Sequence, residues 1–151
     1  MTEENQKKIR QEVKEFYAVW RGMNYVYNDW AKRHGLSFYQ LYSLYAIWES
    51  KGLCTQKDIC GQWLLPKQTV NTILKNYEEE GLITFHVSES DKRNKMIGLT
   101  DKGQEYADEV LGELTALETD VFRTMGAERS HELVENSRMF TELFESRIQE
   151  K

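Results

Sequence analysis

The stretch that decides the fold covers residues 55–82 and reads TQKDICGQWLLPKQTVNTILKNYEEEGL. Thr55, with Asp58 three residues later, is a helix start signal, because the threonine can cap the helix and the acid can reach back. We expect this helix to be short, since Gly61 and Pro66 follow closely. Pro66 restarts the chain as a second helix whose first turn tolerates proline. Two short helices joined by a tight turn predict a helix-turn-helix.

The second helix, Pro66 to Glu80, has an apolar face and a polar face when its residues are placed 100° apart. The apolar positions are Val70, Ile73, Leu74 and Tyr77. The polar side chains, which we predict to lie in a DNA major groove, are Lys67, Gln68, Thr69, Asn71, Thr72 and Lys75. Amides can pair with adenine, a threonine methyl can contact thymine, and lysine serves guanine or phosphate. An ordinary solvated helix face is the alternative interpretation.

The two ends of this helix-turn-helix differ in their polar residues. Thr55 and Gln56, at the start of the first helix, are predicted to contact DNA phosphate. Three acids, Glu78, Glu79 and Glu80, end the second helix. We expect them to point away from the DNA groove, because a recognition helix reads bases with its N-terminal half.

After Gly81 the pattern changes from helix to strand. Residues 82–87 and 96–99 are β-prone and are joined by a charged tip, which predicts a β-hairpin, or wing. The cations of the tip, which can enter a minor groove or follow phosphates, are Lys92, Arg93 and Lys95. Asp91 can hold the guanidinium of Arg93 by a fork-shaped ion pair and so aim it. A solubilising turn is the alternative, but the position directly after a helix-turn-helix favours a role in DNA binding.

Amphipathic helices flank this unit on both sides. Apolar residues recur every three or four positions between Asn5 and His34, and a capping box at Ser37 opens a further helix to about Glu49. Two more helices follow residue 100 and are separated by Gly126. The terminal stripes pack either on each other or against a second copy. We favour the homodimer, because a symmetric partner also explains how such a module reads DNA. The residues predicted for this interface are Ile9, Val13, Phe140, Leu143 and Phe144.

These elements together predict a mainly α fold with a small β-hairpin wing. We expect a single domain over residues 1–151. Residues 36–100 form its winged helix-turn-helix DNA-binding part, and residues 1–35 and 101–151 form dimerisation helices.

Aromatic side chains crowd the first two helices. Such stripes are usually core, yet beside the junction of the dimerisation and DNA-binding helices they can also line a pocket for an aromatic or amphipathic ligand. The residues of this candidate effector pocket are Trp20, Tyr27, Trp30, Phe38 and Tyr42.

The charge of the chain is unevenly distributed. The net charge of −5 on 151 residues by itself argues against a nucleic-acid partner. Residues 51–103, however, hold eight Lys and Arg against seven Asp and Glu, whereas the remainder holds twelve against eighteen. The middle third is therefore where a polyanion can dock.

Several classes of protein are disfavoured by the composition. With 40% hydrophobic residues the chain is not a disordered tail, and it has neither an apolar run of membrane-spanning length nor a secretory leader, so we expect a cytoplasmic protein without a membrane partner. The histidines are isolated in sequence, which predicts no metal site. No phosphate loop or nucleophile motif is present, so we predict neither an enzyme nor a cofactor.

The two cysteines, Cys54 and Cys60, match neither a zinc knuckle nor a C-x-x-C redox pair. We expect Cys60 to be a small, inert core residue between the two helices of the motif and Cys54 to lie nearer the surface. A redox role for either is the minority interpretation.

Several of these motifs resemble those of the multiple-antibiotic-resistance regulator (MarR) family. Asp91-x-Arg93 followed by residues 98–103, GLTDKG, resembles the family's wing signature. Residues 55–59, 66–70 and 79–83 resemble its helix-turn-helix in order and spacing. The resemblance covers roughly residues 53–103, and the flanking helices are similar only in length and position.

The resemblance implies an obligate homodimer with a six-helix winged fold, joined through its terminal helices. It also implies binding to pseudo-palindromic operators, usually as a repressor, with release by a small ligand or by thiol oxidation. By position, the residues implied to face the major groove are Gln68, Asn71, Thr72 and Lys75, and Arg93 faces the minor groove. Relatives often carry arginine where this chain has Thr72 and Asn76. Peroxide-sensing relatives use a cysteine near the start of the chain, and this chain has none there.

We therefore predict a sequence-specific, DNA-binding transcription regulator of the repressor type. Its expected partners are double-stranded DNA, a second copy of the chain and a small aromatic or amphipathic ligand. One alternative is a winged-helix module that binds another protein. A second is a ligand-binding protein with incidental DNA affinity.

Overall fold

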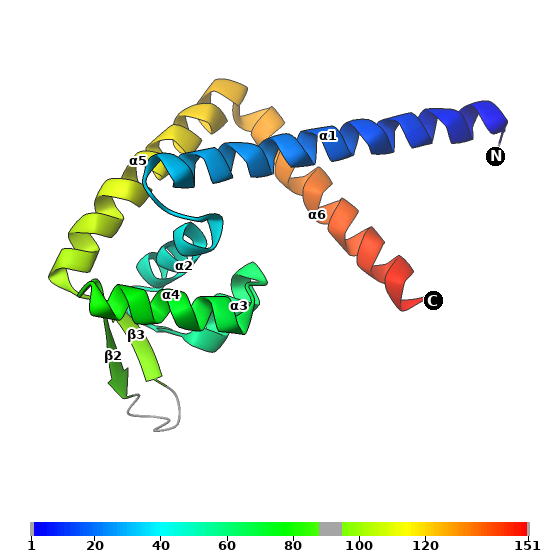
Figure 1. The fold of residues 1–151 in the computed structure, drawn as a ribbon. Helices are drawn as coiled ribbons and strands as arrows, with labels where there is room; N and C mark the ends of the chain where they lie inside the picture. Colours follow the sequence, from blue (N-terminus) through cyan, green and yellow to red (C-terminus); the bar gives the residue numbers. More distant parts are fainter. Residues whose placement is uncertain (1, 88–94, 151) are drawn as a thin grey trace. The chain divides into compact units, whose positions relative to one another are not determined.

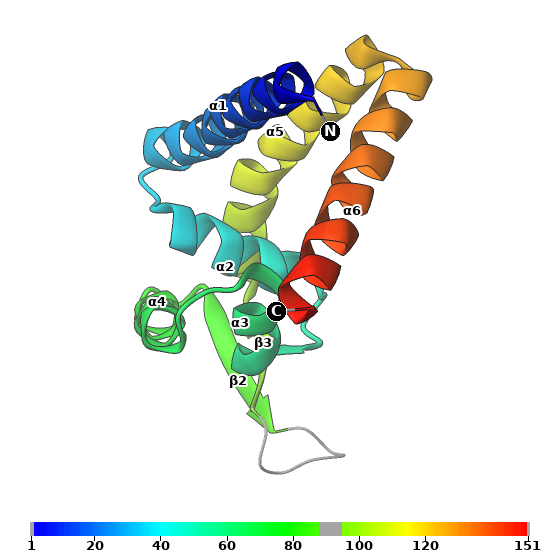
Figure 2. The ribbon, with the colours of Figure 1, turned by 90° about the vertical axis from the view of Figure 1, so that its right-hand side faces the viewer.

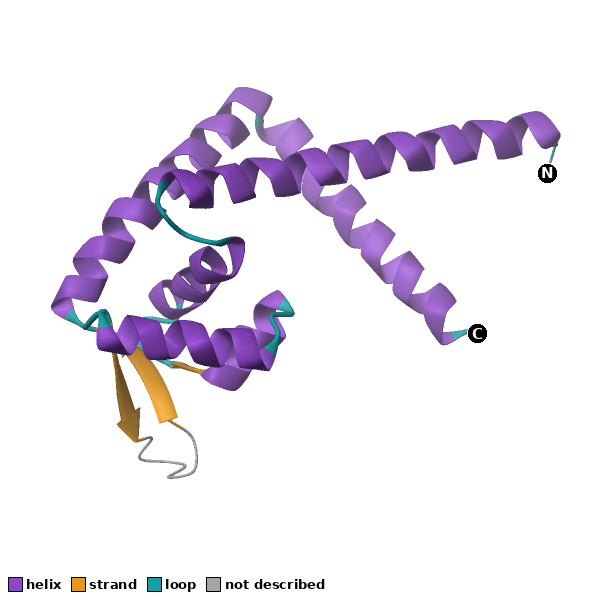
Figure 3. Cartoon of the chain, in the orientation of Figure 1, coloured by secondary structure: helices purple, strands orange, loops and turns teal. Residues whose placement is uncertain are grey.

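The chain folds into long helices and one small sheet (Figure 1). The computed structural model describes residues 2–87 and 95–150. Within them the elements follow in the order α1 (Glu3–Arg33), α2 (Phe38–Glu49), β1 (Cys54–Thr55), α3 (Gln56–Trp63), α4 (Lys67–Glu79), β2 (Ile83–Val87), β3 (Lys95–Leu99), α5 (Asp101–Met125) and α6 (Ala127–Gln149). Figure 3 shows how small a share of the chain is strand. The predicted fold class, mainly α with a β-hairpin wing, is confirmed.

Internal contacts divide the chain into two compact units, Met1–Ala107 and Asp108–Lys151. The first unit holds α1 to α4, the sheet and the first turns of α5. The second unit holds the rest of α5 and all of α6, with Gly126 between them at φ 82°. The predicted winged part, residues 36–100, lies wholly within the first unit.

Two capping boxes begin the helices where the sequence predicts. The Ser37 hydroxyl accepts from the Gln40 backbone N–H at 3.2 Å, and the Gln40 side chain accepts from the Ser37 N–H at 2.9 Å. At the start of α3, Asp58 accepts from both the backbone N–H and the hydroxyl of Thr55, each at 2.8 Å. These hydrogen bonds satisfy donors that a helix N-terminus otherwise leaves unpaired.

Helix α3 is short, as the sequence predicts. It continues past Gly61 to Trp63 and ends at Leu64 in the left-handed region, with φ 50° and ψ 38°. The N–H of Leu65 then bonds to the Cys60 carbonyl at 3.1 Å, which satisfies a carbonyl at the helix end. Pro66 is the residue before α4 rather than its first helical residue.

The sheet has one strand more than the sequence predicts. Its order is β1-β3-β2, antiparallel throughout, and the two-residue strand β1 pairs Cys54 with Ile97. In the hairpin, Phe85 lies opposite Ile97 and Val87 lies opposite Lys95. Figure 2 shows β2 and β3 beside α3 and α4, with α4 viewed nearly end-on.

The core of the first unit joins α2, the helix-turn-helix and the sheet. The largest fully buried side chains include Leu41, Leu44, Ile47, Ile59, Val70, Tyr77 and Ile97. The Tyr77 hydroxyl donates to the Gln40 carbonyl at 3.0 Å, which ties α4 to the first turn of α2. Burial raises the pKa of Tyr77, so the hydroxyl remains a donor.

The start of α5 packs closely against the chain that leaves α4. A Cβ at Gly103 would overlap the carbonyl of Leu82, so only glycine fits there. Thr100 fixes the same junction, since its hydroxyl donates to the Gly81 carbonyl at 2.6 Å and its N–H to the Leu82 carbonyl at 3.0 Å.

Across the described parts of the chain, no helix has the length and apolar character needed to cross a membrane.

Candidate nucleic-acid interface

Helix α4 has the two faces that its sequence predicts. Val70, Ile73, Leu74 and Tyr77 are buried. The exposed polar side chains are Lys67, Gln68, Asn71, Thr72 and Lys75, whereas Thr69 is only half-exposed. The Thr72 hydroxyl donates to the Gln68 carbonyl at 3.1 Å, so its donor is bound within α4.

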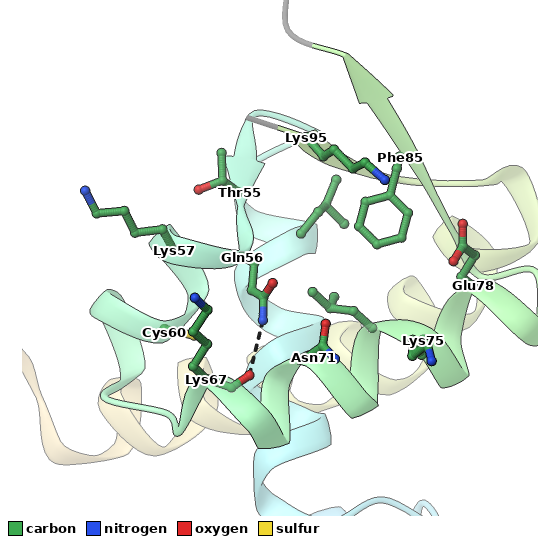
Figure 4. A pocket seen from close by; sticks show the side chains of 12 residues that line it. Thr55, Gln56, Lys57, Cys60, Lys67, Asn71, Lys75, Glu78, Phe85 and Lys95 are labelled. Carbon is green, nitrogen blue, oxygen red and sulfur yellow. Dashed lines mark hydrogen bonds between the residues drawn. The ribbon is translucent and has the colours of Figure 1, made fainter. Parts of the chain in front are cut away.

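A groove of about 630 Å³ lies between α3, α4 and the hairpin (Figure 4). Its apolar lining comes from Leu74, Phe85 and Ile97. Its polar lining consists of Thr55, Gln56, Lys57, Cys60, Lys67, Asn71, Lys75, Glu78 and Lys95. Four lysines thus line one hollow with a single carboxylate residue, Glu78. The local charge is positive although the chain as a whole is acidic.

The geometry of this groove is held by contacts between α3 and α4. The Gln56 amide donates to the Lys67 carbonyl at 3.1 Å and so joins the two helix starts. The hydrogen bonds from the Thr55 side chain and backbone lower the pKa of Asp58, which keeps this capping carboxylate ionised. Both residues predicted for phosphate contact, Thr55 and Gln56, therefore line the groove and also build it.

The structure gathers only part of the predicted major-groove set in this groove. Lys67, Asn71 and Lys75 line it, and Gln68 and Thr72 are exposed on α4 outside its lining. Such a division suits a helix that presents one edge to bases and another to the adjacent backbone.

Glu78 is the one acidic side chain in the lining of this groove, where it lies together with Lys75 and Lys95. The helical period explains this placement, because Glu78 lies three residues after Lys75 and seven after Asn71, on the same side of α4.

Lysine 57 is a groove residue that the sequence interpretation missed. It is exposed in the first turn of α3 and faces the same hollow as Lys67 of α4. The sequence position of Lys57 could have indicated this role, because the lysine directly follows Thr55 and Gln56, the predicted phosphate contacts. Only the arrangement of α3 against α4 shows that it belongs with the polar residues of α4.

The wing contributes Lys95, which is exposed at the start of β3, next to the ring of Phe85. The other predicted wing residues, Asp91, Lys92 and Arg93, lie outside the described residues.

The predicted environments of the two cysteines are wrong and must be exchanged. Cys54 is 4% exposed because it lies in β1, where its thiol contacts the Ile97 carbonyl at 4.0 Å. Cys60 is half-exposed and lines the groove. Desolvation raises the pKa of both thiols, although Lys67 opposes the shift at Cys60. A raised pKa leaves little thiolate at neutral pH, so neither is an activated nucleophile.

The predicted effector-pocket residues lie partly together. The Tyr42 ring is 4.5 Å from Phe38 and 6.2 Å from Tyr27, between ring centroids. Trp63 of α3, which was not predicted, joins this aromatic cluster at 4.2 Å from Tyr42.

The remaining two pocket residues lie elsewhere along α1. The ring centroids of Trp30 and His34 lie 4.3 Å apart in a tilted arrangement, and Trp20 is 54% exposed beside Tyr17. The indole N–H groups of Trp30 and Trp63 are buried without a hydrogen-bond partner. Buried donors of this kind are rare and can receive an acceptor from a bound molecule.

The side chains predicted for dimerisation are exposed in the single chain. On α1 the exposed fractions are 46% for Ile9 and 47% for Val13. In the second unit, Phe140, Leu143 and Phe144 are 46–59% exposed, and none of the residues of α6 is buried. The rings of Phe140 and Phe144 stack with centroids 5.8 Å apart.

Among the described residues, no three His, Cys, Asp or Glu side chains come close enough to hold a metal ion. The site instead offers ammonium, amide and hydroxyl donors, which bind anionic and polar surfaces.

Helices α3 and α4 followed by an antiparallel hairpin form a winged helix-turn-helix. Residues 34–94 match the MarR family. Over 87 residues the chain is 34% identical to the organic hydroperoxide resistance transcriptional regulator of Bacillus subtilis, a match that covers 58% of each chain. The chain spans about half the length of the curated relatives that it matches.

Solved structures extend the similarity to the terminal helices. A MarR family regulator from Neisseria meningitidis is 28% identical with a TM-score of 0.79, over 92% of this chain and 97% of that one. Reduced AbfR, whose structure was determined bound to DNA, is 25% identical with a TM-score of 0.66, over 95% and 99%. The winged helix-turn-helix part of the chain is thus similar to the MarR family, and the relatives that it matches are transcription regulators.

Proposed function

We propose that this chain is a DNA-binding transcription regulator that holds duplex DNA against the groove between α3, α4 and the hairpin. The observation that carries the proposal is the gathering of four lysines beside the polar face of α4, in a chain whose net charge is −5. The DNA complex of the relative AbfR supports it. Since the partner would be chromosomal DNA, we place the protein in the cytoplasm.

Helix α4 enters the major groove in this mechanism. Gln68, Asn71 and Thr72 face base edges, where each good bidentate contact discriminates by about 1–3 kcal/mol. The hydroxyl of Thr72 is bound to its own helix, so its methyl group is the part left to read a thymine. The lysines of the groove hold phosphates and fix the register of the helix on the duplex.

The wing follows the adjacent backbone or minor groove in this mechanism. Lys95 provides one cation from the described hairpin. Lys92 and Arg93, aimed by Asp91, remain the predicted cations of the tip.

In this proposal the form that recognises DNA is a homodimer, with a second copy of the chain. The exposed apolar residues of α1 and α6, which include Val13 and Phe144, would be covered by the partner. A two-fold axis then sets two α4 helices about 34 Å apart, which suits successive major grooves and a pseudo-palindromic operator. We propose that occupancy of such an operator represses transcription.

A small aromatic or amphipathic ligand would release this repressor. The aromatic cluster of Tyr27, Phe38, Tyr42 and Trp63 joins α1, α2 and α3, and the buried indole donors can bind an acceptor on the ligand. Such a ligand can shift the spacing of the α4 helices only through different affinities for the two shapes. The bond from Tyr77 to Gln40 links α2 to α4 directly.

Selection of bound sequences from a random duplex pool tests the proposal. We expect an enriched site with two related half-sites about 10 base pairs apart. Asn71→Ala should change the preferred bases, while Lys32→Ala, at an exposed lysine outside the groove, should not. Enrichment of nothing above the starting pool would contradict DNA recognition. Binding that ignores salt would favour a protein-binding module instead, since phosphate contacts weaken steeply with salt.

A further inference from the structure

We propose that Phe85 is a positioning residue for DNA binding, and that its ring holds the ammonium of Lys95 over the groove. The inference rests on the proposed function and assigns a role to a side chain that makes no base contact. The Lys95 Nζ lies 5.7 Å from the centroid of the Phe85 ring, within the range of a cation–π interaction. Figure 4 shows the Lys95 side chain extending toward Phe85, with its nitrogen beside the ring.

The register of the hairpin produces this contact. Phe85 pairs with Ile97 and Val87 pairs with Lys95, so Phe85 and Lys95 are diagonal neighbours on one face of the two strands. Side chains on that face point the same way, and both residues line the groove. Ile97 is fully buried, which holds the strand that carries Lys95. The strand register therefore places the ring and the lysine on the same face of the hairpin.

The ring solves a specific problem for an exposed lysine. The lysine side chain has four rotatable bonds, and ordering it on a phosphate costs conformational entropy. A cation held on an aromatic face has already lost much of that freedom before DNA arrives. The ammonium has three N–H donors, so one side can rest on the ring while another donates to a phosphate.

Phe85 is also only half-buried, so the hydrophobic core does not by itself account for an aromatic ring there. An aliphatic side chain also suits a half-buried strand position opposite Ile97, but it has no negative face for a cation. The ring thus positions the Lys95 ammonium in addition to packing against its neighbours.

Substitution of the ring, scored by DNA affinity, tests the proposal. We compare Phe85→Leu with Phe85→Trp in the full chain, each with Lys95 present and with Lys95→Gln, on a labelled mixed-sequence duplex of about 30 base pairs. Phe85→Leu should weaken binding about two- to five-fold per protomer, and Phe85→Trp should retain wild-type affinity. In the Lys95→Gln background neither change should matter. A structural role alone would reduce affinity equally in both backgrounds.

A replacement that keeps the shape of the ring covers the case in which Phe85→Leu fails to fold. Pentafluorophenylalanine at position 85 removes the negative ring face and should give the same loss, with an unchanged melting temperature. Wild-type-like binding by this variant, or tighter binding, would overturn the positioning role. If the wild type itself fails to bind any duplex, the proposed function fails instead, so the two failures are distinct.

Discussion

Replacing Lys57 with alanine tests the groove at a residue that sequence reasoning overlooked. Lys57 is exposed at the start of α3 and lines the groove beside Lys67. Because Lys57 is exposed and alanine is the best helix former, the change should leave the melting temperature nearly unaltered. Its effect on DNA binding therefore isolates one phosphate contact.

The size of that effect follows from counterion release. Each phosphate neutralised on duplex DNA contributes about 0.9 to the slope of log affinity against log salt. The four groove lysines of each protomer give a dimer a slope of about −7, and Lys57→Ala should reduce its magnitude by about 1.8. At about 0.15 M salt this corresponds to a loss of up to about 30-fold in affinity.

Fluorescence anisotropy across a salt series measures both quantities. Lys32→Ala is the matched control, since Lys32 is also an exposed helical lysine of the first unit but does not line the groove. It should retain the wild-type slope. Equal slopes for Lys57→Ala and wild type would refute the assignment of α3 to the phosphate-binding surface.

Three further predictions concern the fold that supports the groove. Gly103→Ala should lower the free energy of unfolding by about 1–3 kcal/mol in urea titrations, because its Cβ meets the rigid backbone of Leu82; a stability equal to wild type would refute this close approach. Tyr77→Phe removes the hydrogen bond from α4 to the Gln40 carbonyl and should cost about 0.5–1.5 kcal/mol by thermal unfolding, whereas no change would show that water replaces the hydroxyl. Asp58→Asn should destabilise the protein at neutral pH, and the gap to wild type should close as the pH falls. This follows because the folded-state pKa of Asp58 is lowered, so its contribution is present above the unfolded pKa of about 3.9 and is lost on protonation at lower pH. A gap that is constant from pH 7 to about pH 2 would contradict the ionised cap.

Local signals predicted the helices well. Ser37 and Thr55 start α2 and α3 through capping boxes whose members are three residues apart, so the determining contacts lie within one helical turn. The two faces of α4 follow from the helical period alone.

Features that depend on residues distant in sequence were missed. Strand β1 has two residues and exists because Cys54 pairs with Ile97, 43 residues later. The same pairing buries Cys54. Because strand β1 was not predicted, Cys54 was expected near the surface. Leu64 ends α3 at an exposed fraction of 89%, in a conformation for which its sequence carries no signal.

The groove also combines features that local sequence predicts with features that depend on distant residues. Its lysines on α4 were visible as a polar face. Lys57 and Phe85 become part of the site only because α3 and the hairpin pack beside α4.

The central claim is that duplex DNA covers the groove between α3, α4 and the hairpin. Lysine acetylation with and without bound duplex, followed by mass spectrometry, tests it directly at individual residues. We predict that DNA protects Lys57, Lys67, Lys75 and Lys95 and leaves Lys32 as reactive as before. Equal acetylation of the four groove lysines in the free and DNA-bound protein would contradict the account.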